Sequence, residues 1–121
     1  DVLEVPYTSI QEVPIFPGCE KVKPSKRRAC FDKKMQKHIQ RKFNSSLVSQ
    51  LGLSSGKKKI RIEFVISKTG EIKITNSSAP DIRLEKEGKR VVNKLPTMTP
   101  GKQNGEPVRV KYQLPITFEV E

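Results

Sequence analysis

The chain has 121 residues, of which 34% are apolar, and a formal net charge of +11. This length allows one domain with a single modest core. No run of about 18 apolar residues occurs, so no segment is expected to span a membrane, and no signal peptide is visible. Because Asp1 is not an initiator Met, the chain is expected to be a fragment of a longer protein.

The first 24 residues are expected to be extended, because short apolar runs alternate with prolines at positions 6, 14, 17 and 24. The stretch "YTSIQEV", residues 7–13, is compatible with a short strand outside the centre of a sheet, where proline is tolerated. The sequence "FPGC" at residues 16–19 predicts a turn.

The two cysteines, Cys19 and Cys30, leave three alternatives open. They are compatible with a disulfide, with two buried free thiols, or with a metal site that includes His38. The spacing of these residues matches no familiar zinc module, which counts against the metal site. A bridge across so short a loop would stabilise the fold by roughly 3 kcal/mol.

Helical patterns follow the cysteines. Ser25 is the expected N-cap of a helix that runs through Phe43. Its apolar stripe recurs at every fourth residue and indicates a core-facing helix, not a cofactor site: Phe31, Met35, Ile39 and Phe43. A short second helix is expected around Leu47, Val48 and Leu51, with Gly52 as its stop.

A β-hairpin is predicted next, because apolar residues alternate on both sides of the turn sequence "KTGE" at 68–71. The alternating residues are Ile60, Ile62, Phe64 and Ile66, followed by Ile72 and Ile74. Asp81 is then the expected N-cap of another helix, which Pro96 ends. The expected apolar set of this helix is Ile82, Leu84, Val91, Val92 and Leu95. Gly88 weakens its interior by about 1 kcal/mol relative to Ala.

Residues 108–120 give the clearest strand pattern. The even positions are all apolar: Val108, Val110, Tyr112, Leu114, Ile116, Phe118 and Val120. A period of two is the signature of a strand with one buried face. However, Pro115 lies inside this strand, and a strand paired on both sides cannot accept a residue that lacks an N–H.

The connections predict the order of the strands. A helix links the second hairpin strand to the last strand, and such a crossover normally joins strands that run the same way. In an antiparallel sheet these two cannot be neighbours, so the first hairpin strand is expected between them. The last strand is then an edge, which tolerates Pro115. This edge is expected either to accept a partner's strand or to be covered by the N-terminal segment or a second copy.

Basic residues cluster in "KVKPSKRR" at 21–28, "KKMQKHIQRK" at 33–42 and "GKKKIR" at 56–61. A basic soluble surface is favoured, because no RNA-binding signature, zinc-finger spacing or interleaved stacking aromatics accompany them. A basic nucleic-acid-binding domain is the alternative function. An enzyme is not expected, because one His, no metal cluster and no Gly-rich phosphate loop provide no convergent catalytic groups. No cofactor is expected either.

Three stretches resemble the C-terminal domain of TonB energy transducers, of the type found in Bacteroidetes. They are "VPIFPGC" at 13–19, "ISKTGEI" at 66–72 and "RVVNKLPTMTPGKQNGEPVRVKYQLPITF" at 90–118. The resemblance implies a small antiparallel sheet with two helices packed on one face. Together with the strand order predicted from the connections, the expected fold class is α+β, with three main strands in the order 2-1-3 and two main helices on one face. Residues 1–18 are then expected to be an extended N-terminal or linker segment, and residues 19–121 the TonB-like domain.

The resemblance also implies a function. TonB proteins have a helix that anchors them in the inner membrane and a proline-rich linker across the periplasm. Their C-terminal domain binds the TonB box of outer-membrane transporters, which adds as a strand beside the last strand. Proton-motive energy from an inner-membrane motor complex, reached through the missing N-terminal region, thereby drives substrate import. The chain is therefore expected to be a non-enzymatic periplasmic adaptor with no nucleic-acid partner, and homodimerisation is left open.

The implied partner-binding residues lie on the last strand. They are Val108, Arg109, Val110, Lys111, Tyr112, Gln113, Leu114, Pro115, Ile116, Thr117 and Phe118. The resemblance also places Cys19 and Cys30 in the periplasm, an oxidising compartment, and so implies that they are joined in a disulfide.

Overall fold

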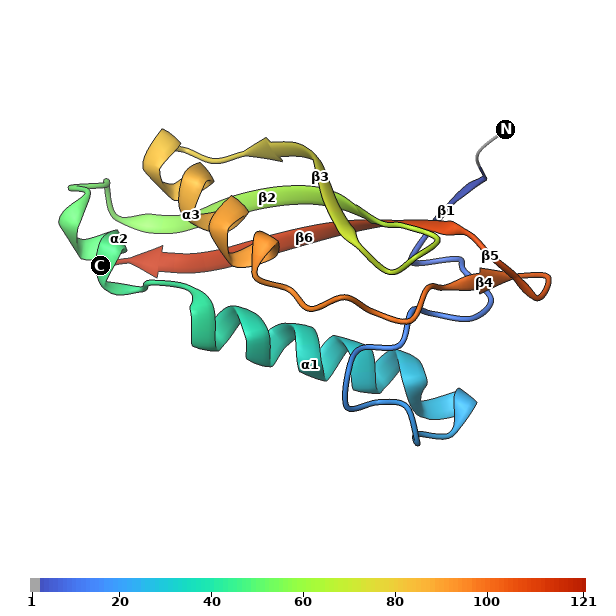
Figure 1. Ribbon diagram of the computed structural model, residues 1–121. Coiled ribbons are helices and arrows are strands. Elements are labelled where there is room, and N and C mark those ends of the chain that lie inside the picture. Colours follow the sequence, from blue (N-terminus) through green and yellow to red (C-terminus); the bar gives the residue numbers. More distant parts are fainter. Residues whose placement is uncertain (1–2) are drawn as a thin grey trace.

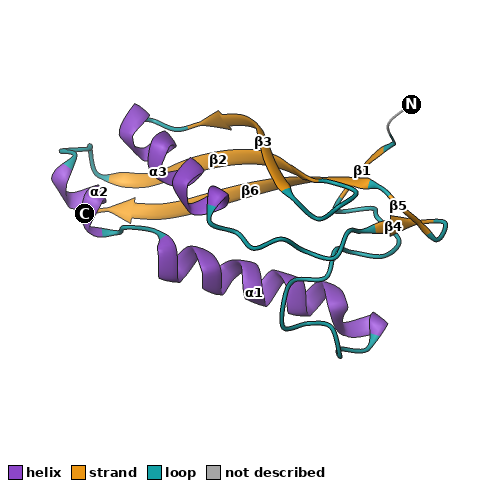
Figure 2. Ribbon diagram, in the orientation of Figure 1, coloured by secondary structure: helices purple, strands orange, loops and turns teal. Residues whose placement is uncertain are grey.

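The computed structural model describes residues 3–121 (Figure 1). Its strands are β1 (Glu4–Pro6), β2 (Gly56–Ile66), β3 (Ile72–Ser78), β4 (Lys102–Gln103), β5 (Glu106–Pro107) and β6 (Arg109–Val120). Its helices are the 3₁₀ turn η1 (Pro24–Lys26), α1 (Arg27–Lys42), α2 (Ser46–Gln50) and α3 (Ile82–Asn93). Figure 2 shows α1 running alongside β6, while α3 lies against β2 and β3.

Four of the strands form one mixed sheet in the order β1-β6-β2-β3. Strand β2 pairs antiparallel with both β3 and β6, and its Arg61 lies opposite Ser78 and Pro115. The predicted order of the three main strands is therefore confirmed. Strand β1 adds to the far side of β6 in the parallel direction, with Val5 opposite Val110. The sheet is thus mixed, where the sequence predicted a wholly antiparallel one.

The core lies between the sheet and the two main helices, as the apolar stripes predict. Its largest side chains include Phe31 and Met35 of α1, and Phe64, Leu84, Val91, Val92 and Val110. Ile82 was expected in this set and is instead 62% exposed. Ile82 and Leu84 are two residues apart, which is about 200° around an α-helix, so they cannot both face the sheet.

Gly88 is buried in α3 and faces β2. A Cβ at this position would lie 2.9 Å from Cγ2 of Ile60 and 3.1 Å from Cδ1 of Ile62. The missing side chain therefore lets the helix pack close to the strand, which offsets the low helix propensity of glycine.

The predicted caps are partly confirmed. Asp81 is the N-cap of α3, where its carboxylate accepts from the Arg83 N–H at 2.8 Å. Hydrogen bonds from the Arg83 side chain and backbone lower the pKa of Asp81 to about 2. Ser25 does not cap α1, because Pro24 opens a 3₁₀ turn one residue earlier and Lys26 takes the N-cap position. Proline fixes a helical φ and suits the first position of a helix.

A buried carboxylate joins α3 to the segment after α1. Glu87 is 9% exposed and accepts from the Asn44 N–H at 2.8 Å. It also accepts two hydrogen bonds from the Arg90 guanidinium. The same guanidinium donates a further hydrogen bond to the carbonyl of Lys42. These bonds, chiefly those from Arg90, lower the pKa of Glu87. The carboxylate therefore satisfies the backbone at the end of α1 from a neighbouring helix.

The N-terminal segment crosses the domain before it reaches α1. The strand expected over residues 7–13 is wrong: pairing is confined to Glu4–Pro6, and residues 7–9 turn away. The chain then makes single bridges from Glu12 to Lys102 and from Ile15 to Thr99. Five of its apolar side chains are buried: Val5, Tyr7, Ile10, Val13 and Phe16. The proposed division of the chain at residue 18 stays a prediction.

The loop before β6 contains a small hairpin of β4 and β5 that the sequence patterns did not predict. Its two central residues, Asn104 and Gly105, have φ values of 53° and 78°. Positive φ at both positions is the requirement of a type I′ turn, for which Asn-Gly is the preferred pair. The backbone N–H of Asn104 donates to the Gln11 side chain at 2.6 Å, so the hairpin also holds the N-terminal segment.

Candidate partner-binding edge

The side chains of β6 alternate between two environments. The even-numbered Val110, Leu114 and Ile116 are buried against the helices, whereas Gln113, Pro115, Thr117 and Glu119 are exposed on the open face. This alternation follows from the period of two in a strand. The inward side chains are part of the core and are not available to an incoming partner.

The backbone of β6 alternates in the same way. The N–H of Arg109 donates to the carbonyl of Leu3 at 3.3 Å, and the carbonyl of Lys111 accepts from the N–H of Tyr7 at 2.9 Å. Both residues are odd-numbered, so the odd positions of β6 direct their polar backbone groups away from β2 and toward the outer edge. Beyond Lys111, no strand in the described part of the chain pairs with this edge.

The position of Pro115 explains why proline is tolerated in the longest apolar strand pattern. It is odd-numbered and lies opposite Arg61 of β2, so its nitrogen faces the outer edge. No hydrogen bond of the sheet is therefore lost. The interpretation of Pro115 as an edge residue is confirmed. The edge itself is divided: β1 covers Arg109–Lys111, and the remainder from Gln113 is open. The expected cover by the N-terminal segment is thus correct for the first part only.

Tyr7 follows β1 directly and anchors the end of this strand at the point where the chain separates from β6. Its hydroxyl donates to Oδ1 of Asp32 at 2.8 Å, and its carbonyl accepts from Arg28 at 2.7 Å. The Arg28 guanidinium lies 4.7 Å from the centre of the Tyr7 ring. The centre of the Tyr112 ring, on β6, lies 4.9 Å from the centre of the Tyr7 ring. Burial and the hydrogen bond to Asp32 raise the pKa of Tyr7. The first turns of α1 thus hold the covering strand in place.

A hollow of about 510 Å³ lies at the fork between β1 and β6. It is lined by Tyr7, Thr8, Lys111, Tyr112 and Gln113, together with Pro6. Burial, followed by the charge of Asp32, raises the pKa of Tyr112 to about 12. The open part of the edge therefore begins at a hollow whose lining includes two tyrosines, Tyr7 and Tyr112.

The open face of the sheet is basic along β2. Lys57, Lys59 and Arg61 project from it and are exposed. Glu63 follows on the same face, and its carboxylate is engaged by Lys111 at 3.3 Å and by the hydroxyl of Thr75 at 3.2 Å. The positive charge beside the edge is thus concentrated at the three residues that precede Glu63 in the strand.

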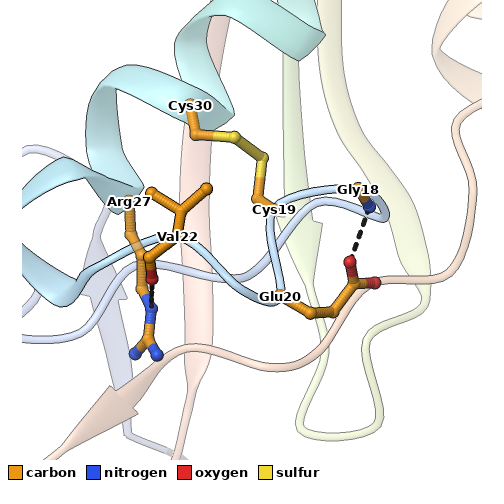
Figure 3. The surroundings of a disulfide bond; sticks show 6 residues. All are labelled: Gly18, Cys19, Glu20, Val22, Arg27 and Cys30. Carbon is orange, nitrogen blue, oxygen red and sulfur yellow. Dashed lines mark hydrogen bonds between the residues drawn. A yellow bond between two sulfur atoms is a disulfide. The ribbon is translucent and has the colours of Figure 1, made fainter.

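A disulfide joins Cys19 to Cys30 and confirms the implied pairing (Figure 3). Its Cα atoms lie 6.1 Å apart. The turn that carries Cys19 is held by a hydrogen bond from the Gly18 N–H to Glu20 at 2.8 Å, and Arg27 donates to the carbonyl of Val22 at 3.3 Å. The predicted turn at residues 16–19 is also confirmed, because the Cys19 N–H donates to the Phe16 carbonyl. The bridge therefore ties the N-terminal segment to the start of α1.

The structure divides the predicted partner-binding residues into three groups. Val108, Val110, Tyr112, Leu114, Ile116 and Phe118 point inward, Arg109 and Lys111 are paired with β1, and Gln113, Pro115 and Thr117 lie at the open edge. Sequence reasoning did not single out Lys59 and Arg61, which lie beside Thr117 and Pro115. The alternation of "KKKIRIE" was the available signal, since it places both cations on the side opposite Ile60 and Ile62.

Residues 3–121 contain neither a metal site nor a membrane-spanning helix. No group of three or more His, Cys, Asp or Glu side chains is arranged to hold a metal ion. No helix there has the length and apolar character needed to cross a membrane.

The structure is thus a two-layer α+β domain whose last strand has a partly open edge. The chain matches the family model of the Gram-negative bacterial TonB protein C-terminal over residues 57–120, from β2 to the end of β6. It therefore belongs to the TonB C-terminal family. Searches of curated proteins and of solved structures gave no match.

Family membership establishes the coarse function. TonB proteins are non-enzymatic transducers, so the prediction that the chain is not an enzyme is confirmed. The family implies energy transduction to TonB-dependent outer-membrane transporters and a location in the periplasm. It also favours the transducer over the nucleic-acid-binding alternative. The Bacteroidetes type stays a prediction.

Proposed function

We propose that the open part of β6 accepts a strand from an outer-membrane transporter and that the domain transmits force to the transporter through this added strand. The observation that carries the proposal is the free backbone of Gln113, Thr117 and Glu119, whose N–H groups face outward with no strand of the described chain beside them. A peptide in extended conformation can satisfy such groups by β-augmentation. In the family, the partner segment is the TonB box, and the energy comes from an inner-membrane motor through an N-terminal anchor.

The added strand has a defined place on the edge. Strand β1 already occupies Arg109–Lys111, so the partner pairs from Gln113 onward, and Pro115 interrupts its ladder by one donor. The carbonyl of Pro115 remains available as an acceptor. The hollow beside Tyr7 lies where the end of such a strand would meet β1. The partner therefore extends the sheet on the side of β6 that β1 leaves uncovered.

A proline scan of the outward positions tests this proposal. Thr117→Pro removes one free donor, whereas Thr117→Ala keeps it and serves as the matched control. Ten-residue peptides from the plug segments of TonB-dependent transporters of the same bacterium are titrated calorimetrically into each variant, after circular dichroism has shown that the variants are folded. We expect Thr117→Pro to weaken binding by about 1–3 kcal/mol, because a carbonyl of the peptide is left unpaired. Thr117→Ala should bind nearly as the original protein does.

Gln113→Pro and Gln113→Ala repeat the comparison at the other end of the open edge. If both folded proline variants bind the peptides as tightly as the unaltered domain, the edge of β6 is not the docking site and the proposal fails.

A further inference from the structure

Two cations on the open face of the sheet have no partner of opposite charge within residues 3–121. Lys59 lies opposite Thr117 of β6 and Arg61 lies opposite Pro115, and both are exposed. Neither makes an ion pair or a side-chain hydrogen bond with a described residue. The nearest acid along the strand, Glu63, is already engaged by Lys111. The two positive charges are therefore available to a group that comes from outside the domain.

The same cations line a hollow of about 330 Å³ on the open face. Its polar lining consists of Lys59, Arg61, Glu63, Asn76, Ser77, Ser78 and Gln113, and Pro115 forms part of its wall. Glu63 is the one acid among them, and its carboxylate is already engaged by Lys111. Most of these side chains carry hydrogen-bond donors, and the two charged donors suit a carboxylate. Because Gln113 and Pro115 also belong to the open edge of β6, the hollow lies directly beside the place of the added strand.

The distances favour a contact across β6. Neighbouring strands are about 4.8 Å apart, so an added strand would lie about 10 Å from β2, with β6 between them. The side chains of its alternate residues would project on the open face beside Gln113, Pro115 and Thr117. Pro115 lies opposite Arg61 on β6, so its short ring is the side chain between Arg61 and the added strand. A long guanidinium side chain and a carboxylate side chain can together span that gap.

Pro115 also gives a reason for such a contact. The residue of the added strand that faces it gains no backbone donor, because proline has no N–H. A hydrogen-bonded ion pair made by its side chain would replace part of the lost interaction and would fix the register of a strand whose backbone contacts are independent of sequence.

We propose that the transporter strand carries an acidic side chain on the open face beside Pro115 and that this carboxylate binds Arg61, with Lys59 as a second cation. This inference rests on the proposed function and names the chemistry of the partner. A peptide carboxylate is favoured over a polyanion such as nucleic acid or an anionic membrane, because Glu119 lies opposite Lys57 and Glu63 follows Arg61 on the same face. A uniformly negative surface would meet both of these acids.

A charge-swap cycle tests the proposal. The probes are the plug-segment peptides that bind the domain, each with its acidic residues changed singly to Gln and to Lys. They are titrated into the unaltered domain, Arg61→Gln, Arg61→Glu and Lys59→Gln, whose folding is checked by thermal unfolding. Lys73→Gln is the matched control, because Lys73 is exposed on the open face of β3, opposite Val65, and does not line the hollow.

We expect Arg61→Gln to weaken binding of the acidic peptide about fivefold, the upper range for an exposed ion pair. It should leave the Gln peptide unaffected. Arg61→Glu should weaken binding of the acidic peptide more than Arg61→Gln does. The Lys peptide should bind Arg61→Glu with restored affinity. Lys59→Gln should have a smaller effect, and Lys73→Gln none.

Three results would overturn the proposal. If Arg61→Glu binds the acidic, Gln and Lys peptides equally well while Thr117→Pro still weakens their binding, the edge functions without this ion pair. If Arg61→Glu weakens binding to phosphatidylglycerol vesicles and not to the peptides, the face is a membrane-binding surface. If no peptide binds the unaltered domain at all, the proposed function fails together with this inference.

Discussion

The backbone N–H of Tyr7 donates to the carbonyl of Lys111 across 2.9 Å, and β1 leaves the sheet at this bond. The chain turns immediately afterwards, since the N–H groups of Ser9 and Ile10 both donate to the carbonyl of Pro6 at 3.0 Å. The tight turn fixes how far β1 can extend along β6. Strand β1 therefore protects one end of an edge that is otherwise open, which is one way in which proteins limit unwanted strand pairing.

Removal of β1 should make the domain self-associate. A variant without residues 1–5 frees the outward N–H groups of Arg109 and Lys111, while Tyr7 keeps its bond to the Lys111 carbonyl, and so extends the free edge toward the start of β6. It also loses the buried Val5 side chain, worth about 1.5–3 kcal/mol. We expect a folded but less stable domain whose weight-average mass in sedimentation rises with concentration.

The matched control adds Lys111→Pro to the truncated variant, which removes one newly exposed donor and should reduce the association. A truncated domain that stays monomeric at every concentration would show that β1 does not protect the edge.

Loss of the disulfide should destabilise the domain. The bridge between Cys19 and Cys30 closes a loop with a sequence separation of 11, for which the chain-entropy estimate is about 3 kcal/mol. We expect the Cys19→Ser, Cys30→Ser double variant to lose about 2–4 kcal/mol of unfolding free energy in urea. A reductant should shift the midpoint of the unaltered protein and leave that of the double variant in place. An equal midpoint for the oxidised unaltered protein and the double variant would contradict the expectation.

Gly88→Ala should destabilise the domain in spite of the better helix propensity of alanine. The added Cβ would lie 2.9 Å from Cγ2 of Ile60, a branch that cannot rotate away without moving the strand side chain. Overpacking costs about 1–3 kcal/mol, and the propensity gain returns about 1 kcal/mol. We expect a net loss of about 1 kcal/mol. Lys86→Ala, at an exposed position of the same helix, is the control and should change stability by less than about 0.5 kcal/mol.

The elements with strong periodicity could be predicted from the sequence. The alternation around Phe64 and along β6 gave the hairpin and the last strand, and Pro115 gave the edge. Strand β1 could not be predicted, because "EVP" is too short to show a period and its partner is an edge created by the rest of the fold. Parallel pairing between segments more than 100 residues apart has no local signature.

The candidate site was predictable to the same extent. The strand that carries the edge was found, but the part that is open depends on where Tyr7 leaves the sheet. Lys59 and Arg61 appeared as members of a general basic cluster, because their place beside Thr117 and Pro115 follows from the register of β2 on β6. A register between distant strands is set by tertiary packing, so charge along the chain could not reveal it.

The last prediction concerns the two tyrosines beside the fork of β1 and β6. Burial raises the pKa of Tyr112 to about 12, and burial together with the Asp32 hydrogen bond raises that of Tyr7 further. In the unfolded chain both should ionise near pH 10. The unfolded state therefore loses these protons first, so the stabilisation is complete below about pH 10 and is lost as the pH rises through the native pKa values.

The chain has two tyrosines and no tryptophan, so the ultraviolet absorbance of tyrosinate reports on these residues alone. We expect no tyrosine to ionise near pH 10 in the folded protein, whereas the unfolded protein in urea should ionise both there. In Tyr112→Phe, the remaining tyrosinate signal comes from Tyr7. This signal should appear only at a pH where circular dichroism shows unfolding, because ionisation of Tyr7 requires its hydroxyl to leave Asp32 and its ring to leave Phe31. A Tyr7 that ionises near pH 10 in the folded variant would show that β1 is not held at the fork, and the edge of β6 would then be open along its whole length.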